Sequence, residues 1–408
     1  MGELLGRSRF PSLAGLLRLR RDAIALQRAR YVKLLLVCLG LLLVVDAVAG
    51  WPYLVARLQA VSVLERVGGQ AVPAPVRWLV NEPVKTEELT LQLPSGAVRA
   101  RMYTPVKHPD APGMVIVHGV HYMGMDEPRL EAFASAIAAC GLRVLTPELP
   151  NIKDYHIGPE SIASIGDTAA WMTHVGGGKP VGVMGLSFSG SLSLLAAAEP
   201  RYQRDIKFVV AVGSEDAMSR VAKYYLTGRA LRPSGEAEML APHEYGALVL
   251  EYESLEDFVP AADRNAVRLV LRDHLYEDFP AERAALAKLT PMQRVEARQL
   301  MDTTSPATRK MIAESDARHA VEMASVSPDG RLGTLTTPVF LLHGEGDNII
   351  PSAETQWLER DVPKGEMEDS LISPVISHLD LDGKGPGFGD QWRLVHFFAK
   401  ILHAAEAR

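Results

Sequence analysis

Residues 181–190 read Val-Gly-Val-Met-Gly-Leu-Ser-Phe-Ser-Gly, and this stretch decides the fold. An apolar run typical of a buried strand (181–186) passes directly into a helical pattern. A serine at such a junction, here Ser187, is held on a sharp, strained turn with its hydroxyl exposed. The turn needs small residues on either side because they pack against each other, and Gly185 and Ser189 are both small.

Two interpretations of Ser187 follow. It is either a nucleophile or the N-cap of a packing helix. The strand–turn–helix context favours the nucleophile. The pattern is G-x-S-x-S where G-x-S-x-G is usual, but Gly190 follows, so we expect a feasible and more crowded turn. Ser189 is less suited to attack because it would lie inside the helix.

A second apolar strand, 114–117, ends in His118-Gly119. The loop after such a strand can supply one backbone N–H of an oxyanion hole, and the residue after the nucleophile supplies the other. These positions are Val120 and Phe188. We interpret His118 as a residue that shapes the loop.

An acid is expected just past a third strand, 339–342, where Asp347 lies on a glycine-rich loop. A carboxylate there can orient an imidazole and stabilise its charged form. Asp347 could also be a simple turn residue. Glu215 and Asp216 are rival acids, because they follow another strand end (208–212).

A base is required because serine is a poor nucleophile at neutral pH. His378 follows Asp347 by 31 residues, after a strand near 371–376 and before a terminal helix. His396 competes with it, but its apolar neighbours place it on a packing helix. The order Ser, Asp, His along the chain favours His378.

The pattern around these motifs predicts an α/β fold with a mostly parallel, doubly wound sheet. A β-hairpin (89–93 with 98–103) precedes buried strands that alternate with helices. The alternation stops at residue 214 and resumes at 336, and between them we find only helical signals. The sequence thus predicts a core of 86–213 and 336–408, with 214–335 as a helical insertion.

Together these motifs resemble the α/β-hydrolase superfamily over about 86–213 and 335–405. They are, in family order, His118-Gly119, Gly185-Leu186-Ser187-Phe188-Ser189, His343-Gly344-Glu345-Gly346-Asp347 and His378. The resemblance implies a triad of Ser187, His378 and Asp347, with a lid inserted between the sixth and seventh strands. The region 214–335 fits that lid. Ser189 departs from the family pattern.

The N-terminus predicts a membrane anchor. Residues 1–33 carry eight basic and two acidic side chains. The run 34–49 is almost wholly apolar and is bracketed by Tyr31 and Trp51, so we take 34–52 as the membrane segment. Such a length spans about 30 Å, and the basic flank favours a cytoplasmic N-terminus. We therefore expect a basic cytoplasmic segment, one transmembrane helix and a stalk over 53–85, with the catalytic domain outside.

A cleaved signal peptide is the alternative, because Ala47-Val48-Ala49 resembles a cleavage site. Cleavage would give a secreted or periplasmic protein. The basic segment is long for a signal peptide, which favours the anchor.

Composition excludes several other classes. The chain has 408 residues, 47% hydrophobic and 23% charged, with a net charge of −6, so neither disorder nor nucleic-acid binding is indicated. Its two cysteines exclude a disulfide framework. There is no phosphate-binding loop, no H-E-x-x-H and no dinucleotide fingerprint, and 380–383 lack the glutamate spacing of a calcium loop. We expect no cofactor and no metal.

The sequence therefore predicts a membrane-tethered serine hydrolase that cleaves a carboxylic ester through an acyl-enzyme on Ser187. Alternatives are an acyltransferase or amidase on the same residues, or a non-catalytic binding module. Lipid-like acyl chains are one expectation for the substrate, and a small pocket under a self-packed lid is another. Both rest on the apolar and aromatic residues of the insertion, which include Tyr224, Tyr225, Leu226, Leu248, Leu250 and Tyr252. The oligomeric state is open.

Overall fold

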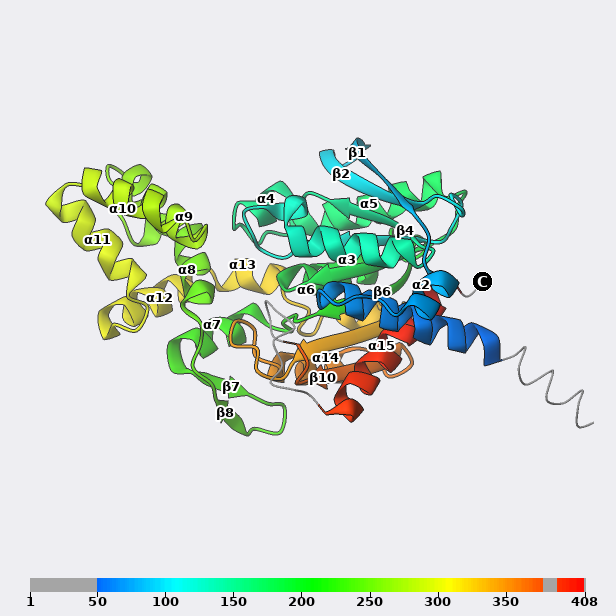
Figure 1. Cartoon of the computed structure of the whole chain (residues 1–408). Helices are drawn as coiled ribbons and strands as arrows, with labels where there is room; N and C mark the ends of the chain where they lie inside the picture. Colours follow the sequence, from blue (N-terminus) through cyan, green and yellow to red (C-terminus); the bar gives the residue numbers. More distant parts are fainter. Residues whose placement is uncertain (1–49, 377–386, 407–408) are drawn as a thin grey trace, which may run out of the picture. The chain divides into compact units, whose positions relative to one another are not determined.

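The computed structural model describes residues 50–376 and 387–406 and centres on one eight-stranded sheet (Figure 1). The strand order is β1-β2-β4-β3-β5-β6-β9-β10, and only β2 runs against the others. The predicted mostly parallel sheet is confirmed. The strands are β1 (Val84–Leu93), β2 (Gly96–Pro105), β3 (Gly113–Val117), β4 (Arg143–Pro147), β5 (Val181–Leu186), β6 (Ile206–Val212), β9 (Val339–Gly344) and β10 (Met367–Ser373).

Helices cover both faces of the sheet because its central strands are apolar on both sides. Val115 and Val117 lie in one buried cluster with α5 and α6, and Met114 and Ile116 lie in a second with α3 and α15. The helices outside the insertion are α2 (Ala74–Val80), α3 (Pro128–Ala139), α4 (Pro150–Lys153), α5 (Glu160–Val175), α6 (Phe188–Ala198), α14 (Ala353–Asp361) and α15 (Phe388–Glu406).

The insertion between β6 and β9 is mainly helical. Its helices often begin at proline, whose missing N–H is not needed in the first turn, as at Pro291 and Pro306. The helices are α7 (Met218–Thr227), α8 (Glu244–Glu253), α9 (Arg264–Leu275), α10 (Phe279–Lys288), α11 (Pro291–Met301), α12 (Pro306–Arg318) and α13 (Ala320–Ser325). Short 3₁₀ turns lie at 124–126, 255–257 and 332–334.

Two features of the insertion and the core differ from expectation. The insertion contains a small antiparallel hairpin, β7 (Arg229–Leu231) with β8 (Ala237–Met239). Three-residue strands are too short to show an alternating pattern, which is why no strand was expected there. The core contains α14 between β9 and β10, and β10 begins before the strand expected near 371–376.

The segment 53–85 was expected to be a stalk, but from Ala56 onward it packs against the core. Helical residues 50–67 bury Ala56, Ala60 and Val63 in the same cluster as α3 and α15. Gln59 Nε2 donates to the Cys140 carbonyl at 2.8 Å. The three apolar residues recur at helical spacing, so one face of this helix belongs to the core.

The predicted transmembrane helix lies outside the described residues except for 50–52. Within 50–376 and 387–406, no helix is both long enough and apolar enough to cross a membrane.

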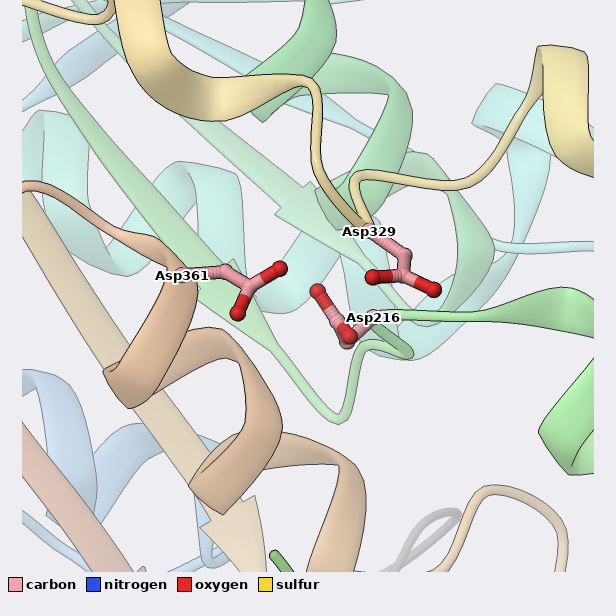
Figure 2. Close-up of side chains that lie close together, drawn as sticks. All are labelled: Asp216, Asp329 and Asp361. Carbon is pink, nitrogen blue, oxygen red and sulfur yellow. The ribbon is translucent and has the colours of Figure 1, made fainter.

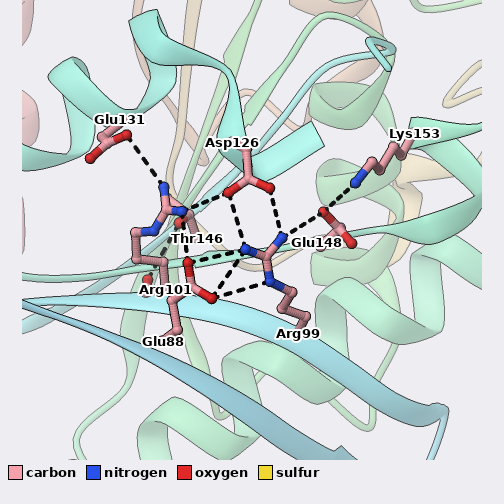
Figure 3. A network of polar contacts seen from close by, with 8 residues as sticks. All are labelled: Glu88, Arg99, Arg101, Asp126, Glu131, Thr146, Glu148 and Lys153. Atoms are coloured by element: carbon pink, nitrogen blue, oxygen red, sulfur yellow. Dashed lines mark hydrogen bonds and ion pairs between the residues drawn. The ribbon is translucent and has the colours of Figure 1, made fainter. Parts of the chain in front are cut away.

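Ion pairs fasten the β1–β2 hairpin to the rest of the sheet (Figure 3). Arg101, whose side chain is 11% exposed, donates to Asp126 at 2.6 Å and to Glu88 at 3.0 Å. Arg99 also donates to Asp126, at 2.6 Å, and lies 3.5 Å from Glu148. Asp126 precedes α3, so the network joins the hairpin to the loop between β3 and that helix.

Candidate active site

Ser187 has the strained backbone that the sequence pattern predicts. Its φ is 56° and its ψ is −136°, a region that residues other than glycine rarely adopt. Three hydrogen bonds hold this turn. Ser187 N donates to Val212 O at 2.7 Å, and Ser187 O accepts from Gly190 N and from Ser214 Oγ, both at 2.9 Å. The turn is thereby tied to the end of β6.

Close packing explains the small residues around the turn. A Cβ on Gly185 would lie 2.3 Å from Ser189 O, and one on Gly190 would lie 1.9 Å from Ser214 Oγ. Both positions therefore require glycine. Ser189 is accommodated because its buried Oγ points to the neighbouring loop and donates to His118 O at 2.6 Å. The departure from the usual motif thus adds a hydrogen bond between the start of α6 and the loop after β3.

The loop after β3 lies against Ser187. A Cβ on Gly119 would be 3.2 Å from Ser187 Cβ, so this glycine permits the close approach. In the described part of the chain, neither Val120 N nor Phe188 N has a hydrogen-bond acceptor. The Val120 carbonyl accepts a hydrogen bond from Tyr245 Oη at 2.8 Å. This bond fixes the orientation of the peptide that follows Val120.

His118 is a structural part of this loop. It is buried, its Nε2 accepts from Leu149 N at 2.9 Å, and its Nδ1 therefore carries the proton that reaches Gly119 O at 2.8 Å. Burial lowers the pKa of His118 to about 4. The ring is therefore neutral near pH 7 and has both nitrogens engaged.

Asp347 lies past the end of β9 on the sheet edge that also carries Ser187. The parallel register pairs Leu186 with Val212 and Val212 with Leu342, which places the ends of β5, β6 and β9 side by side. The Asp347 carboxylate is buried, and its Oδ1 accepts from Ile349 N at 2.9 Å and Ile350 N at 3.0 Å.

His378 lies outside the described residues. The last pair of β10, Ser373 with Gly344, shows that the chain leaves β10 at the same sheet edge. The competitor His396 is described, and it is an exposed residue of α15.

The rival acids have other surroundings. Asp216 Oδ2 accepts from Arg220 at 2.7 Å, and Arg220 also donates to Glu354 at 2.7 Å. Glu215 is fully buried, and both its carboxyl oxygens lack a hydrogen-bond partner. Burial raises its pKa well above the usual value, which favours the neutral acid. Asp216 is therefore already paired with an arginine, and Glu215 favours its uncharged form. Neither carboxyl group is well suited to orient an imidazole.

Sequence reasoning missed the aromatic residues that support the loop after β3. Tyr245 of α8 bonds Val120 O, and its ring centroid lies 6.2 Å from that of Tyr155. Tyr155 is fully buried, and its hydroxyl donates to Leu275 O at 3.2 Å. These contacts join the core loops to α8 and α9. No local motif marks them, because they form between segments 90 to 125 residues apart.

Comparisons with known proteins give distant structural likenesses. No sequence-family model matches the chain, and no curated protein matches it by sequence. The Pyrobaculum calidifontis esterase is 16% identical, with 85% of this chain and 90% of that chain covered and a TM-score of 0.41. Carboxyl esterase 2 of Tuber melanosporum is 16% identical, with 79% and 86% covered and a TM-score of 0.43. A 2,6-dihydroxy-pseudo-oxynicotine hydrolase is 12% identical, with 81% and 69% covered and a TM-score of 0.43.

The fold can be assigned from the strand order and the turn at Ser187 alone, and the comparisons are not needed for it. An eight-stranded sheet whose second strand alone is antiparallel, with a strained serine between β5 and α6, is the α/β-hydrolase fold. The chain has this fold, as the resemblance of its motifs implied.

Proposed function

We propose that the protein is a serine hydrolase that cleaves a carboxylic ester through an acyl-enzyme on Ser187. The strained turn at Ser187 carries the proposal. A left-handed backbone at a non-glycine residue costs about 1–3 kcal/mol and persists where surrounding structure imposes it. Such strain is concentrated at functional sites, and here it leaves the side chain at the end of a parallel strand, where catalytic groups of this fold lie.

The reaction would run in two steps. Ser187 Oγ attacks the ester carbonyl while His378 takes its proton, and the tetrahedral oxyanion binds the amides of Val120 and Phe188. His378 then protonates the leaving alcohol. Water, activated by the same imidazole, hydrolyses the acyl-enzyme. Asp347 orients His378 and stabilises its charged form.

The two amide donors support acyl-transfer chemistry, of which ester cleavage is the simplest case. Neither has an acceptor in the described chain, and Tyr245 and Ser189 fasten the loop that carries Val120. One such donor contributes roughly 3 kcal/mol to transition-state stabilisation because it is already oriented. Preorganised donors of this kind suit acyl transfer.

A fluorophosphonate probe tests the nucleophile. Wild-type protein should be labelled and Ser187→Ala should not. Ser193→Ala is the matched control, since its buried hydroxyl lies on the same helix and donates to Ser189 O, and it should still be labelled. Equal labelling of wild type and Ser187→Ala, or no labelling of wild type, contradicts the proposal.

The insertion and the N-terminus complete the proposal. Residues 214–335 form a lid over the site, and 34–52 anchor the protein so that its catalytic domain lies on the non-cytoplasmic side. The basic flank of 1–33 supports this orientation. A reporter fused to the C-terminus should be active only outside the cytoplasm, and carbonate-resistant membrane association separates an anchor from a cleaved signal.

For the substrate we propose apolar acyl chains of medium to long length. An anchored site near lipid, with an apolar insertion above it, supports this preference. Acyl esters of increasing chain length should show rising kcat/KM, with further gain in micelles. A maximum at acetate, with no gain from added methylenes, contradicts it.

A further inference from the structure

Three carboxylates converge outside the Ser187 site. They belong to Asp216, just after β6, Asp329, near the end of the insertion, and Asp361, the last residue of α14. One oxygen of each lies within 4.8 Å of the other two. Figure 2 shows Asp216 between the other two, with the three side chains directed toward a common space.

The Asp216 side chain provides an independent indication of a ligand. It is completely buried, and although Oδ2 accepts from Arg220, Oδ1 has no hydrogen-bond partner. A buried carboxylate oxygen without a partner is costly, because it has lost its hydration and gained nothing in return. A cation at this position would restore the lost interactions.

The nearby cations do not balance the charge. Arg220 is shared between Asp216 and Glu354, with distances of 2.7 Å to each. Two carboxylates are therefore opposed by one guanidinium before Asp329 and Asp361 are counted.

The negative charge of Asp361 is only weakly balanced by neighbouring groups. Its Oδ1 lies 3.3 Å from Nε of Arg360, which is a solvent-exposed side chain, and its Oδ2 accepts from Gly330 N at 3.1 Å. If all four carboxylates are ionised, their negative charge exceeds the charge of the two arginines by two.

We propose that Asp216, Asp329 and Asp361 bind a divalent cation, with calcium preferred. The three ligating groups offer oxygen only, which suits calcium or magnesium and not zinc. Calcium accepts oxygens at about 2.3–2.6 Å in flexible geometry, whereas magnesium demands a near-ideal octahedron at about 2.1 Å. One oxygen of each carboxylate lies within 4.8 Å of the other two, so a single ion can contact all three. Three protein carboxylates are more than magnesium usually takes, which favours calcium. Asp329 is exposed, so water can complete the coordination shell.

The position of the site suggests what the ion would do. Asp216 lies in the first residues of the insertion and Asp329 in its last ones, and Asp329 N already donates to Asp216 O at 3.0 Å. Asp361 belongs to the core. The ion would therefore join both ends of the insertion to α14. This role does not depend on hydrolase activity.

Calcium titration of the metal-stripped full chain tests the proposal directly. Isothermal calorimetry should show one site, and the thermal midpoint should rise with calcium. Asp329→Asn should weaken calcium binding roughly tenfold or more, because a charged ligand is lost while the exposed position tolerates the change. Glu359→Gln, an exposed acid on α14 outside the cluster, is the matched control and should bind as wild type.

Terbium provides a readout that does not depend on stability. Trp357 packs on Arg220, with 4.1 Å from the guanidinium carbon to the ring centroid, so its indole lies beside the site. Bound terbium should emit when this indole is excited, and calcium should displace it. Lack of calcium binding at about 1 mM, unchanged binding in Asp329→Asn, or equal response to magnesium would overturn the proposal.

Discussion

At the scale of single residues, Ser187 occupies a conformation suited to glycine (φ 56°, ψ −136°) while its proposed chemistry needs a hydroxyl. Substitutions at Ser187 distinguish the effect of the backbone conformation on stability from the effect of the hydroxyl on activity. Ser187→Gly should relieve strain and raise the free energy of unfolding by about 1 kcal/mol relative to Ser187→Ala, which keeps a Cβ. Both variants should be inactive. Urea denaturation of the pair measures the difference, and equal stabilities would show that the turn is not strained.

His118 should make stability depend on pH. Its pKa falls from an ordinary 6.5 to about 4 on burial, so the unfolded chain binds more protons between these values. Stability is therefore complete above pH 6.5 and decreases as the pH falls toward 4, by at most about 3 kcal/mol.

The comparison that isolates this effect uses His118→Gln, which can keep both hydrogen bonds of the ring. Unfolding free energies of wild type and variant at pH 7 and pH 4.5 should show a smaller acid loss in the variant. Parallel losses would mean that other groups cause the dependence.

The sequence identified the serine turn because local chain chemistry determines it. Gly185 and Ser187 are close in sequence and in space, so their spacing alone carries the signal. Asp347 was placed by the order of strand ends. Tyr245 could not be found this way, because its role depends on a contact from the insertion to the core. Glu215 was named as a rival acid, but its burial without a partner could not be predicted from its position in the sequence.

At the scale of elements, α8 carries a buried acid that should weaken the insertion. Glu251 is fully buried, neither carboxyl oxygen has a partner, and desolvation, with repulsion from Asp316, raises its pKa from 4.5 to about 9. The folded state therefore holds a proton that the unfolded chain releases above pH 4.5. Stability is greatest below pH 4.5 and declines as the pH rises toward 9.

Glu251→Gln removes this titration. At pH 7 the variant should be more stable than wild type by on the order of 2 kcal/mol, and the gain should disappear near pH 4.5. Thermal unfolding at both pH values measures it, with the exposed Glu256→Gln as control. A gain of the same size at both pH values would point to packing instead of charge.

Element prediction worked where burial on both faces makes a strand continuously apolar. The strands β3, β5, β6 and β9 are continuous apolar runs because helices cover both sheet faces. It did not work for β7 and β8, whose three residues give no period, or for α14, which was not anticipated between the last two strands.

At the scale of the whole molecule, helical residues 56–67 belong to the folded core. Deleting 1–49 should leave the unfolding midpoint of the remaining chain unchanged. Deleting 1–67 removes the buried Ala56, Ala60 and Val63 and the Gln59 hydrogen bond, so it should expose the cluster shared with α3 and α15. Destabilisation of several kcal/mol follows from lost burial. Circular dichroism melts compare the two truncations, and identical melts would contradict this assignment.

The neighbouring strands β6 and β9 are separated along the chain by the whole insertion, and this has a consequence for biosynthesis. The ribosome completes β1 to β6 before it begins about 120 residues of helices, which takes roughly 6–24 s at usual elongation rates. Throughout that interval the nascent sheet ends at β6, whose backbone amides and carbonyls await a partner. A nascent chain of this kind is a target for chaperones that cover open sheet edges. Slowing translation within the insertion should therefore increase aggregation, and speeding it should favour the native pairing.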